Sequence, residues 1–329
     1  MIVDLNYASN IFNKYFPDVS VYYHPKYINN ERLNHVNSKP RFFIFEEENQ
    51  VFYHAFVENS VDINGMVYRD IQAPNGYGGP LIVGEKDFQE RAVNYYLKWA
   101  SEQNYIIEFM KFHPLLKSKD YYGEKLFNRK TIVINLEQQE LTLSYKSRIR
   151  RKINKAKREK ISTVFSKEER YIKAFISIYH NLMLSKKADT EYFFTEQYIT
   201  TLIKEEFVQL VSAVDREGHI LGGIIFFQNG YISDYHLSAS NDIGKKFSVT
   251  SLIIHDYAMY AKMNKMKYLY LGGGYNTEIE NSLYHFKQGF SDRELDYCIG
   301  YYVHNHNIYN KLKLEHNIDE NNHRIIFYR

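Results

Sequence analysis

Two tight-turn signals in the second half of the chain separate three strand-length segments. These segments cover residues 208–215, 220–228 and 231–240, and segments of this length between turn signals are typical of β-strands. An Asn-Gly pair at positions 229–230 separates the second segment from the third, and both residue types tolerate the positive φ angles of a two-residue hairpin. With a further turn at 216–219, the sequence predicts two successive hairpins.

Helical and extended patterns alternate around these hairpins. Residues 168–187 repeat apolar side chains at spacings of four, three and four, which predicts a helix. The predicted elements are, in order, a strand at 161–167, helices at 168–187 and 195–207, the three strands, a polar loop at 241–246, a helix at 247–264, a strand at 268–272, a short helix at 282–289 and a strand at 295–305. This order predicts a mixed α/β domain.

The first half of the chain repeats part of this order. Its predicted elements are a hairpin at 41–47 and 51–59, a strand at 66–73, a loop at 74–80, a helix at 85–103 and a strand at 105–112. The halves share little sequence identity, so the repeat is inferred from the architecture. We therefore expect two related α/β domains, residues 1–140 and 141–329, each a mixed sheet flanked by helices.

The composition excludes several classes of protein. The 329 residues contain 42 Lys and Arg against 39 Asp and Glu, so a net charge of +3 gives no basis for nonspecific DNA coating. The longest apolar run, near 220–227, is shorter than the roughly 20 residues that cross a bilayer. Cys298 is the single cysteine, which excludes an intrachain disulfide and a cysteine-based zinc site. The start of the chain lacks the features of a secretory signal. We expect a cytoplasmic protein with no DNA partner, no membrane partner and no metal.

The third strand of the hairpin pair places two polar side chains on one face. Strand alternation puts Asp234 and His236 on the same face, two residues apart. Burying an unpaired polar group costs about 1–3 kcal/mol by mutational estimates, so such a pair is candidate acid–base machinery. An edge strand with one wet face is the alternative.

A glycine and two lysines follow this strand and lead into a helix. A helix start offers free N–H groups and partial positive charge, which together bind phosphate. Gly244 would allow close approach of the backbone, and Lys245 and Lys246 would add charge. Neither the Walker nor the Rossmann glycine spacing is present. An ordinary capped surface loop is the alternative.

Two further segments carry candidate binding groups. A glycine triplet at 272–274 ends a strand, and the short helix at 282–289 beside that exit carries Lys287. Residues 145–160 contain nine Lys or Arg, including Arg148 and Arg151, with an apolar stripe at helical spacing. A solvated helix face explains such a segment, and an anionic partner, either a nucleotide diphosphate or an RNA backbone, is the functional alternative.

These motifs together resemble a known fold family. Tyr77-Gly-Gly-Pro80, Tyr235-His-Leu-Ser-Ala-Ser240, and the glycine triplet followed by Phe286-Lys-Gln-Gly-Phe290 are similar to motifs of tandem GNAT-fold N-acyltransferases related to the Fem-type peptidoglycan bridge transferases. The resemblance spans about residues 40–305. It implies two GNAT-like domains, with a degenerate N-terminal domain on the acceptor side and a C-terminal domain that binds acyl-CoA.

The resemblance also implies roles for individual residues. Asp234, His236 and Lys287 would be catalytic. Coenzyme A would contact Leu237, Gly244, Lys245, Lys246, Phe247 and Ser248, with its pantetheine arm in a splay between two strands near Leu237. The acceptor would contact Tyr77, Gly78, Gly79, Arg148, Arg151, Gly273, Asn276 and Tyr284.

The sequence is interpreted as an N-acyltransferase that moves a short acyl group from acyl-CoA to the amino group of a dTDP- or UDP-linked amino sugar for surface polysaccharide. The chain lacks the coiled-coil arm of many Fem-type enzymes that use aminoacyl-tRNA, which favours a thioester donor. Two alternatives stay open. One is an aminoacyl-tRNA-dependent transferase acting on a peptidoglycan precursor, and the other is a non-catalytic domain pair that binds nucleotide or RNA. The acyl chain, the sugar and a homo-oligomeric state are left open.

Overall fold

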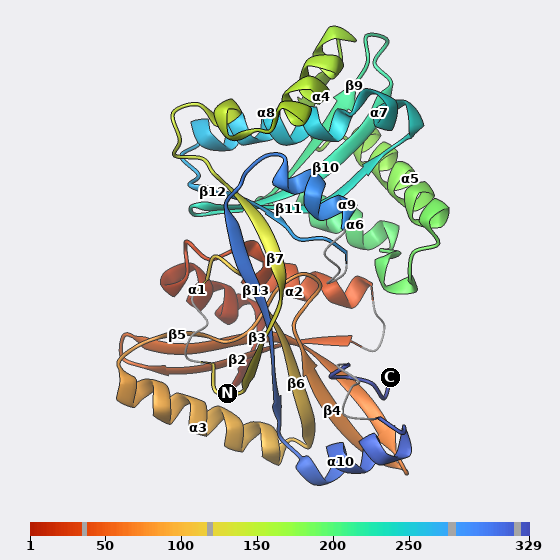
Figure 1. The fold of residues 1–329 in the computed structure, drawn as a ribbon. Coiled ribbons are helices and arrows are strands. Elements are labelled where there is room, and N and C mark those ends of the chain that lie inside the picture. Colours follow the sequence, from red (N-terminus) through yellow and green to blue (C-terminus); the bar gives the residue numbers. More distant parts are fainter. Residues whose placement is uncertain (35–37, 117–120, 276–280, 319–323) are drawn as a thin grey trace. The chain divides into compact units, whose positions relative to one another are not determined.

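The computed structural model describes residues 1–34, 38–116, 121–275, 281–318 and 324–329. The chain forms two compact units (Figure 1). Unit 1 comprises Met1–Pro17, Tyr22–Asn128 and Tyr297–Arg329, and unit 2 comprises Asp18–Val21 and Arg129–Asp296. The chain therefore leaves unit 1 near residue 128 and returns at 297, whereas the sequence placed one boundary at 140. Two long strands, β7 (Glu124–Asn135) and β13 (Glu294–Val303), contain these crossing points.

Unit 2 contains a mixed sheet with the strand order β7-β12-β11-β10-β9-β8. Its other strands are β8 (Ser162–Phe165), β9 (Val208–Val214), β10 (Ile220–Asn229), β11 (Ile232–Ser240) and β12 (Tyr268–Gly272). Its helices are α4 (Ser147–Arg158), α5 (Glu169–Lys186), α6 (Glu196–Lys204), α7 (Asp242–Phe247), α8 (Val249–Met263) and α9 (Ser282–Gln288). β9, β10 and β11 form the two predicted hairpins, and β11 then pairs in parallel with β12.

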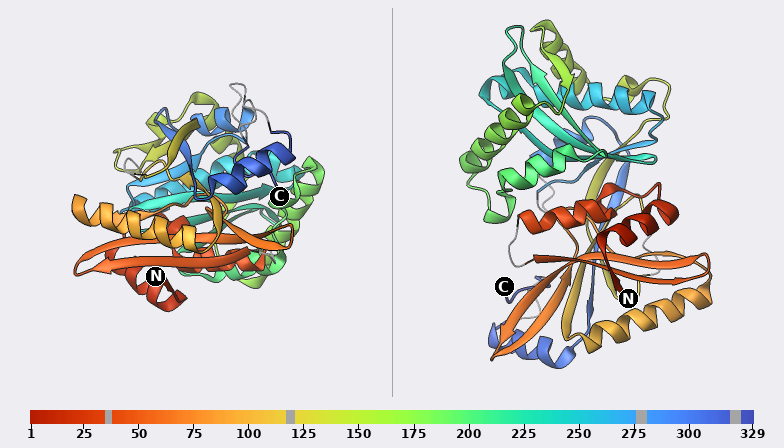
Figure 2. Two further views of the ribbon diagram at one scale, coloured as in Figure 1. Left: turned by 90° about the horizontal axis from the view of Figure 1, so that it is seen from below. Right: turned by 180° about the vertical axis from the view of Figure 1, so that it is seen from behind.

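Helices cover both faces of the unit 2 sheet (Figure 1 and Figure 2). On one face α8 packs through Tyr257, whose ring stacks on Phe226 of β10 at 3.6 Å between centroids. On the other face Phe175 of α5 lies so close to Gly223 that a Cβ there would be 3.0 Å from its ring. Because helices cover both faces of the sheet, side chains on both faces of β10 are buried. This agrees with its nearly continuous apolar sequence.

Unit 1 has a similar order of elements, in a sheet with the strand order β1-β2-β3-β4-β6-β13. Its other strands are β1 (Ile2–Val3), β2 (Ser38–Glu47), β3 (Gln50–Ile63), β4 (Met66–Gln72), β5 (Leu81–Val83), which pairs with β3, and β6 (Tyr105–Phe112). Its helices are α1 (Leu5–Tyr15), α2 (Pro25–Asn30), α3 (Lys86–Glu102) and α10 (His306–Glu315). Short 3-10 helices are η1 (Val21–Tyr23), η2 (Glu31–Leu33), η3 (Leu141–Ser144) and η4 (Thr190–Tyr192).

The periodicity of β3 explains how unit 1 buries both faces of its sheet. Phe52 faces α3, where it contacts Tyr96, while the next residue, Tyr53, faces α1 and contacts Phe12. Buried side chains recur every four residues along α3, at Phe88, Ala92, Tyr96 and Ala100. Among the described residues, no helix combines the length and the hydrophobicity needed to cross a lipid bilayer.

The structure corrects one predicted element and adds others. The polar loop expected at 241–246 is wrong, because Asp242–Phe247 form α7 and Asn241 caps it. The elements that the pattern did not predict are β1, α1, α2, β5, β7, α10 and the four short 3-10 helices. Helix α2 is only six residues long and β5 only three, too short for a periodicity to be recognised.

Candidate functional site

The ladder between β11 and β12 ends well before β11 does. Parallel pairing joins Ile232–Asp234 to Tyr268–Tyr270, and among the described residues no further pair forms between the two strands. β11 continues to Ser240, where it is still paired with β10 on its other side. The two strands therefore form an open fork, with β11 presenting backbone polar groups along an edge that no described strand covers. An exposed strand edge of this kind is a template for an extended ligand.

A β-bulge lies in β11 at the fork. Leu237 and Tyr235 pair with the consecutive β10 residues Ile225 and Phe226, so His236 is the additional residue of the bulge. Tyr235 contacts Phe226 on the α8 side of the sheet. Bulges bend a strand and increase its twist, and this bulge lies where β11 separates from β12.

Lys287 of α9 bridges the two arms of the fork. Its side chain is buried, with 6% of the residue exposed. The Nζ atom donates a 2.8 Å hydrogen bond to the carbonyl oxygen of Gly273, just beyond β12, and lies 5.2 Å from the ring centroid of Tyr235 on β11. Burial, and then the positive charge of Arg129, lowers the pKa of Lys287 to about 7.

Three local features hold Lys287 in place. The side chain of Asn281 caps α9 by accepting hydrogen bonds from the amides of Leu283 and Tyr284. At the other end of α9, Gly289 is required because a Cβ there would lie 2.5 Å from Ile149 of α4. Arg129 donates a 2.9 Å hydrogen bond to the carbonyl of Gly274, beside the carbonyl that Lys287 contacts. The lysine is therefore prepositioned, and near neutral pH both of its protonation states are populated.

Asp234 and His236 do not face this lysine. Asp234 is fully buried and accepts a 2.7 Å hydrogen bond from Ser20, a residue of the short N-terminal segment that belongs to unit 2. His236 stacks on Phe227 with 4.2 Å between ring centroids, and burial lowers the pKa of His236 to about 3. Lys287 instead lies over Tyr235. The acid–base role of Asp234 and His236 stays a prediction, and in this structure both side chains are engaged away from Lys287.

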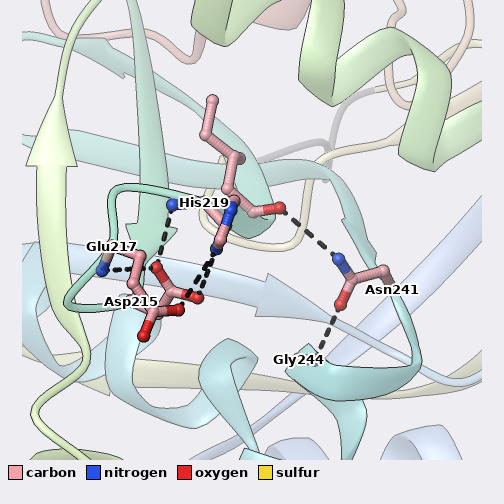
Figure 3. A network of polar contacts seen from close by, with 6 residues as sticks. Asp215, Glu217, His219, Asn241 and Gly244 are labelled. Atoms are coloured by element: carbon pink, nitrogen blue, oxygen red, sulfur yellow. Dashed lines mark hydrogen bonds and ion pairs between the residues drawn. The ribbon is translucent and has the colours of Figure 1, made fainter.

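Two backbone amides of α7 and the amide of the residue that follows it form hydrogen bonds within the chain. The Asn241 side chain accepts a 2.8 Å hydrogen bond from the amide of Gly244 (Figure 3), and the amides of Lys245 and Ser248 donate to backbone carbonyls. Gly244 has a packing reason to be glycine, since a Cβ would lie 2.3 Å from the carbonyl oxygen of Leu221. These three amides are therefore engaged, and the predicted diphosphate site at Gly244–Ser248 stays a prediction in which the side chains of Lys245 and Lys246 are the exposed donors.

Lysine and arginine side chains and aromatic rings of α4, α7 and α9 form a group that we call the basic strip. α4 buries Ile149, Ile153 and Ala156 against α8, as its apolar stripe predicted, and exposes its cations. The basic strip consists of Arg148, Arg151, Lys152 and Lys155 of α4, Lys246 and Phe247 of α7, and Phe286 of α9. Lys155 and Lys246 lie 5.9 and 5.5 Å from the Phe247 ring, and Lys152 lies 5.3 Å from the Phe286 ring. Lys155 also donates to the carbonyl of Lys246, which joins α4 to α7.

The remaining predicted acceptor residues are distributed over both units. Arg148 donates to the carbonyl of His285, and the hydroxyl of Tyr284 donates to Glu294, so both contact the region of α9. Tyr77 lies in unit 1, with ring contacts to Tyr22 and His113 at 5.1 and 5.0 Å. The amide of Gly78 donates to the carbonyl of Lys111. Gly79, with φ of +150°, would bring a Cβ within 2.9 Å of Phe112. Asn276 lies outside the described residues.

Two residues of the fork had no role predicted from the sequence. Tyr235 stood in a recognised motif but was given no role, although its ring faces Lys287. Arg129 carried no sequence signal, because 145 positions separate it from the carbonyl it contacts.

Asp215, Glu217 and His219 place ligand-type atoms within 4.8 Å of one another in the β9–β10 turn (Figure 3). Asp215 accepts hydrogen bonds from the turn amides of Glu217 and His219, so this exposed group has a local structural role.

No protein-family model matches the chain, and no curated protein matches it. Solved structures match it in fold. FemX aligns with a TM-score of 0.70 and 14% identity over 95% of this chain and 99% of FemX. L-PGS from Bacillus licheniformis aligns with a TM-score of 0.63 and 12% identity over 91% of each chain. A tandem GNAT protein from the clavulanic acid biosynthesis pathway gives 0.50 and 8% over 92% of this chain and 98% of that chain. The expected Fem- and GNAT-like fold is confirmed.

Proposed function

We propose that the chain is an acyltransferase that joins an activated acyl group to an amine at the fork of unit 2. The single observation that carries this proposal is the position of Lys287. A buried lysine with a pKa near 7 contacts the exit of one strand and the aromatic side chain of the other, at the point where the two strands separate. Perturbed, buried cations in such positions are typical of functional sites.

Lys287 would act on the carbonyl of the acyl group. Within the described part of the chain it forms one hydrogen bond, to Gly273, so its ammonium retains N–H donors for a ligand oxygen. Attack by a neutral amine forms a C–N bond and places negative charge on the carbonyl oxygen, which a fixed ammonium stabilises. Collapse of the tetrahedral intermediate breaks the bond to the carrier, and the proton lost by the amine passes to the leaving group through water. No covalent intermediate with the protein is needed.

A coenzyme A thioester is the donor that we propose. The uncovered edge of β11, from Tyr235 to Ser240, offers alternating backbone donors and acceptors to the amide groups of a pantetheine arm. Lys245 and Lys246 follow at the end of that edge and would hold the diphosphate through their side chains. The nucleotide-linked amino sugar predicted as acceptor remains part of this proposal.

An aminoacyl-tRNA is the second candidate donor, and the basic strip favours it. The cations of α4 from Arg148 to Arg158 extend over about 15 Å of helix, which exceeds the span of one diphosphate. Half-buried Phe247 and Phe286 lie among these cations. Cations that alternate with stackable rings are typical of single-stranded nucleic-acid binding.

The decisive experiment offers both donors to the purified chain. Acyl-CoAs are combined with dTDP- and UDP-amino sugars while thiol release is followed, and aminoacyl-tRNAs are combined with peptidoglycan precursors with and without RNase. Thiol release that depends on the amino sugar supports the first donor, whereas RNase-sensitive transfer supports the second. A folded sample that transfers nothing from either donor, yet binds nucleotide or RNA, would overturn the catalytic proposal in favour of the binding alternative.

Two lysines test the position of the donor. Lys245→Ala combined with Lys246→Ala should raise the KM for acyl-CoA at least tenfold and leave the KM for the acceptor within about twofold, since each loses a contact to the diphosphate. Lys186→Ala combined with Lys187→Ala is the matched control, because this adjacent pair at the end of α5 is equally exposed. An equal effect on both substrates would show that the diphosphate binds elsewhere.

A further inference from the structure

A second candidate site lies in unit 1, where α3 ends. A pocket of about 380 Å³ opens beside the last turn of this helix, over β2, β3 and β4. This volume lies within the range of roughly 300–1,000 Å³ that small-molecule sites occupy. The residues that matter to its chemistry are Arg41, Glu58, Arg69, Tyr95, Trp99 and Tyr105. The acyl-transfer proposal uses none of these residues.

A buried carboxylate orients two guanidinium groups in this pocket. The side chain of Glu58 is 5% exposed, while those of Arg41 and Arg69 are 38% and 35% exposed. One Glu58 oxygen lies 3.0 Å from Nη2 of Arg41, and the other lies 3.9 Å from Nε of Arg69. Tyr105, itself buried, donates a 2.5 Å hydrogen bond to the same carboxylate. Glu58 is therefore fixed from several sides and holds both arginines at the pocket wall.

Among the described residues, most N–H donors of the two guanidinium groups have no acceptor in the protein. Arg41 donates through Nη2 to Glu58, and Arg69 donates through Nη1 to the carbonyl of Gln103 at the end of α3. Within the described ranges these are their only hydrogen bonds. Two cations against one carboxylate leave one positive charge in excess, and guanidinium N–H pairs match the geometry of carboxylate and phosphate oxygens.

Aromatic side chains supply flat walls next to these donors. Trp99, on the last turn of α3, packs on Tyr105 with 5.5 Å between ring centroids and on Phe43 at 4.8 Å. Tyr95, one turn earlier, is exposed in the same pocket. Because Tyr105 and Phe43 pack against the Trp99 indole, the plane of the indole is fixed. A ligand ring can then stack on Trp99 without first ordering a mobile side chain.

We propose that this pocket binds a small anion that carries a flat ring, of the nucleoside monophosphate class. The anionic group takes the unused N–H donors of Arg41 and Arg69, and the ring lies against Trp99 and Tyr95. Glu58 holds the two cations beside each other and accepts a ligand hydroxyl through its remaining lone pairs. The site lies wholly within unit 1 and is independent of Lys287.

The single tryptophan of the chain makes this proposal directly measurable. Trp99 fluorescence is followed while AMP, UMP, adenosine or inorganic phosphate is titrated into the full chain, and isothermal calorimetry repeats each titration. A nucleoside monophosphate should change the fluorescence saturably, and both adenosine and inorganic phosphate should bind at least tenfold more weakly. Arg41→Gln and Arg69→Gln should each raise the Kd of the nucleotide at least tenfold, because each removes half of the paired donors.

Control variants separate this site from other effects. Arg91 also lies on α3, but it is outside the pocket and contacts Glu47 at 2.6 Å. Arg91→Gln should therefore leave the Kd of the nucleotide unchanged. Lys287→Met should also leave it unchanged, so a failed transfer assay does not affect this result. The proposal is overturned if neither nucleotide binds by calorimetry, or if binding is equal in folded Arg41→Gln and Arg69→Gln. Inorganic phosphate that binds as tightly as AMP would overturn the role of the ring.

Discussion

The two units contain the same parallel strand pair, but only unit 2 leaves it open. In unit 1, β4 pairs in parallel with β6, and the contacts continue beyond the end of β4. The amide of Ala73 donates to Phe109, and the amide of Gly78 donates to Lys111, at 2.9 and 2.8 Å. The loop after β4 thus closes the fork of unit 1, whereas α7 and α8 follow the corresponding strand in unit 2.

A buried charged residue lies near each fork, and the two charges are satisfied to different degrees. Glu108 of β6 accepts hydrogen bonds from the hydroxyls of Tyr96, Tyr121 and Tyr122 at 2.8, 2.7 and 2.7 Å, and His304 lies at 3.2 Å. Lys287 has one such hydrogen bond within the described residues. A buried charged group whose hydrogen-bonding positions are all occupied by the protein stabilises the fold. A buried charged group with unoccupied positions can interact with a ligand. From this comparison we expect a structural role for Glu108, and the proposed chemical role of Lys287 is the one to be tested.

The largest expected effect is the loss of acyl transfer in Lys287→Met. Removal of one donor to a developing oxyanion typically lowers kcat about 10²–10³-fold, while substrate binding changes little. Lys267→Met is the matched control, because Lys267 lies 4.0 Å over the ring of Tyr231 near the other end of β11. Single-turnover transfer measures both variants. If Lys267→Met loses as much activity as Lys287→Met, cation–ring packing rather than chemistry explains the result.

The pH dependence of the rate sharpens the role of Lys287. Its pKa of about 7 lies below the ordinary lysine value, because burial and then Arg129 disfavour the charged form. An ammonium that stabilises the oxyanion is lost as the pH rises through 7, so single-turnover rates corrected for the ionisation of the acceptor amine should fall above that pH. A corrected rate that instead rises through pH 7 would make Lys287 a base. Folding stability should increase with pH from 7 toward 10.5, since only the unfolded lysine binds a proton there.

Glu108→Leu should affect stability rather than catalysis. The substitution leaves three tyrosine hydroxyls and His304 without their acceptor, and breaking a buried network of this kind costs about 3–5 kcal/mol of unfolding free energy. Glu108→Gln, which retains the shape and one acceptor oxygen, should cost less. Urea unfolding measures both. A Glu108→Gln variant of wild-type stability that has lost transfer activity would contradict the structural role.

Gly76→Ala tests how the fork of unit 1 is closed. Gly76 has φ of +93°, and a Cβ there would lie 2.1 Å from the ring of Tyr22, so we expect a loss of about 2–3 kcal/mol. Gly65→Ala is the control, because its φ is +80° with nothing within 4 Å of the added Cβ. It should lose only about 1 kcal/mol, the cost of backbone strain alone. If chemical denaturation gives the same loss of unfolding free energy for both variants, the Tyr22 ring moves aside to accommodate the added Cβ.

The smallest expected effect concerns acid sensitivity in unit 1. His54 is fully buried, and burial lowers its pKa from 6.5 to about 4. Neither ring nitrogen forms a hydrogen bond within the described ranges. The unfolded chain binds a proton near pH 6.5 that the folded chain excludes, so stability should fall as the pH drops from 6.5 toward 4. His54→Phe should remove this dependence and add about 1 kcal/mol at pH 7, as measured by denaturation at both pH values. An unchanged pH slope would assign the acid sensitivity to other groups.

Much of the fold could be predicted because its signals are local. The hairpin of β10 and β11 forms as expected, although its loop residues are Gly230 and Tyr231, one position later than predicted, and only Gly230 has a positive φ. The apolar spacing in residues 168–187 gives α5 within a residue or two at each end. The loop predicted before α8 failed because Asn241, read as part of a polar loop, caps a short helix. The fork that the family resemblance implied near Leu237 is present in the strand register.

The sequence by itself determined the order of elements, the positions of the hairpins and the presence of Lys287 beside a strand exit. Only the tertiary structure decided which polar groups are available. Ser20 binds Asp234 across 214 positions and encloses the carboxylate that the sequence assigned to catalysis. Burial between β11 and α9 brings the pKa of Lys287 to about 7. Secondary structure follows from spacing and turn chemistry within a few residues, whereas desolvation and hydrogen-bond saturation depend on distant segments that meet only in the folded chain.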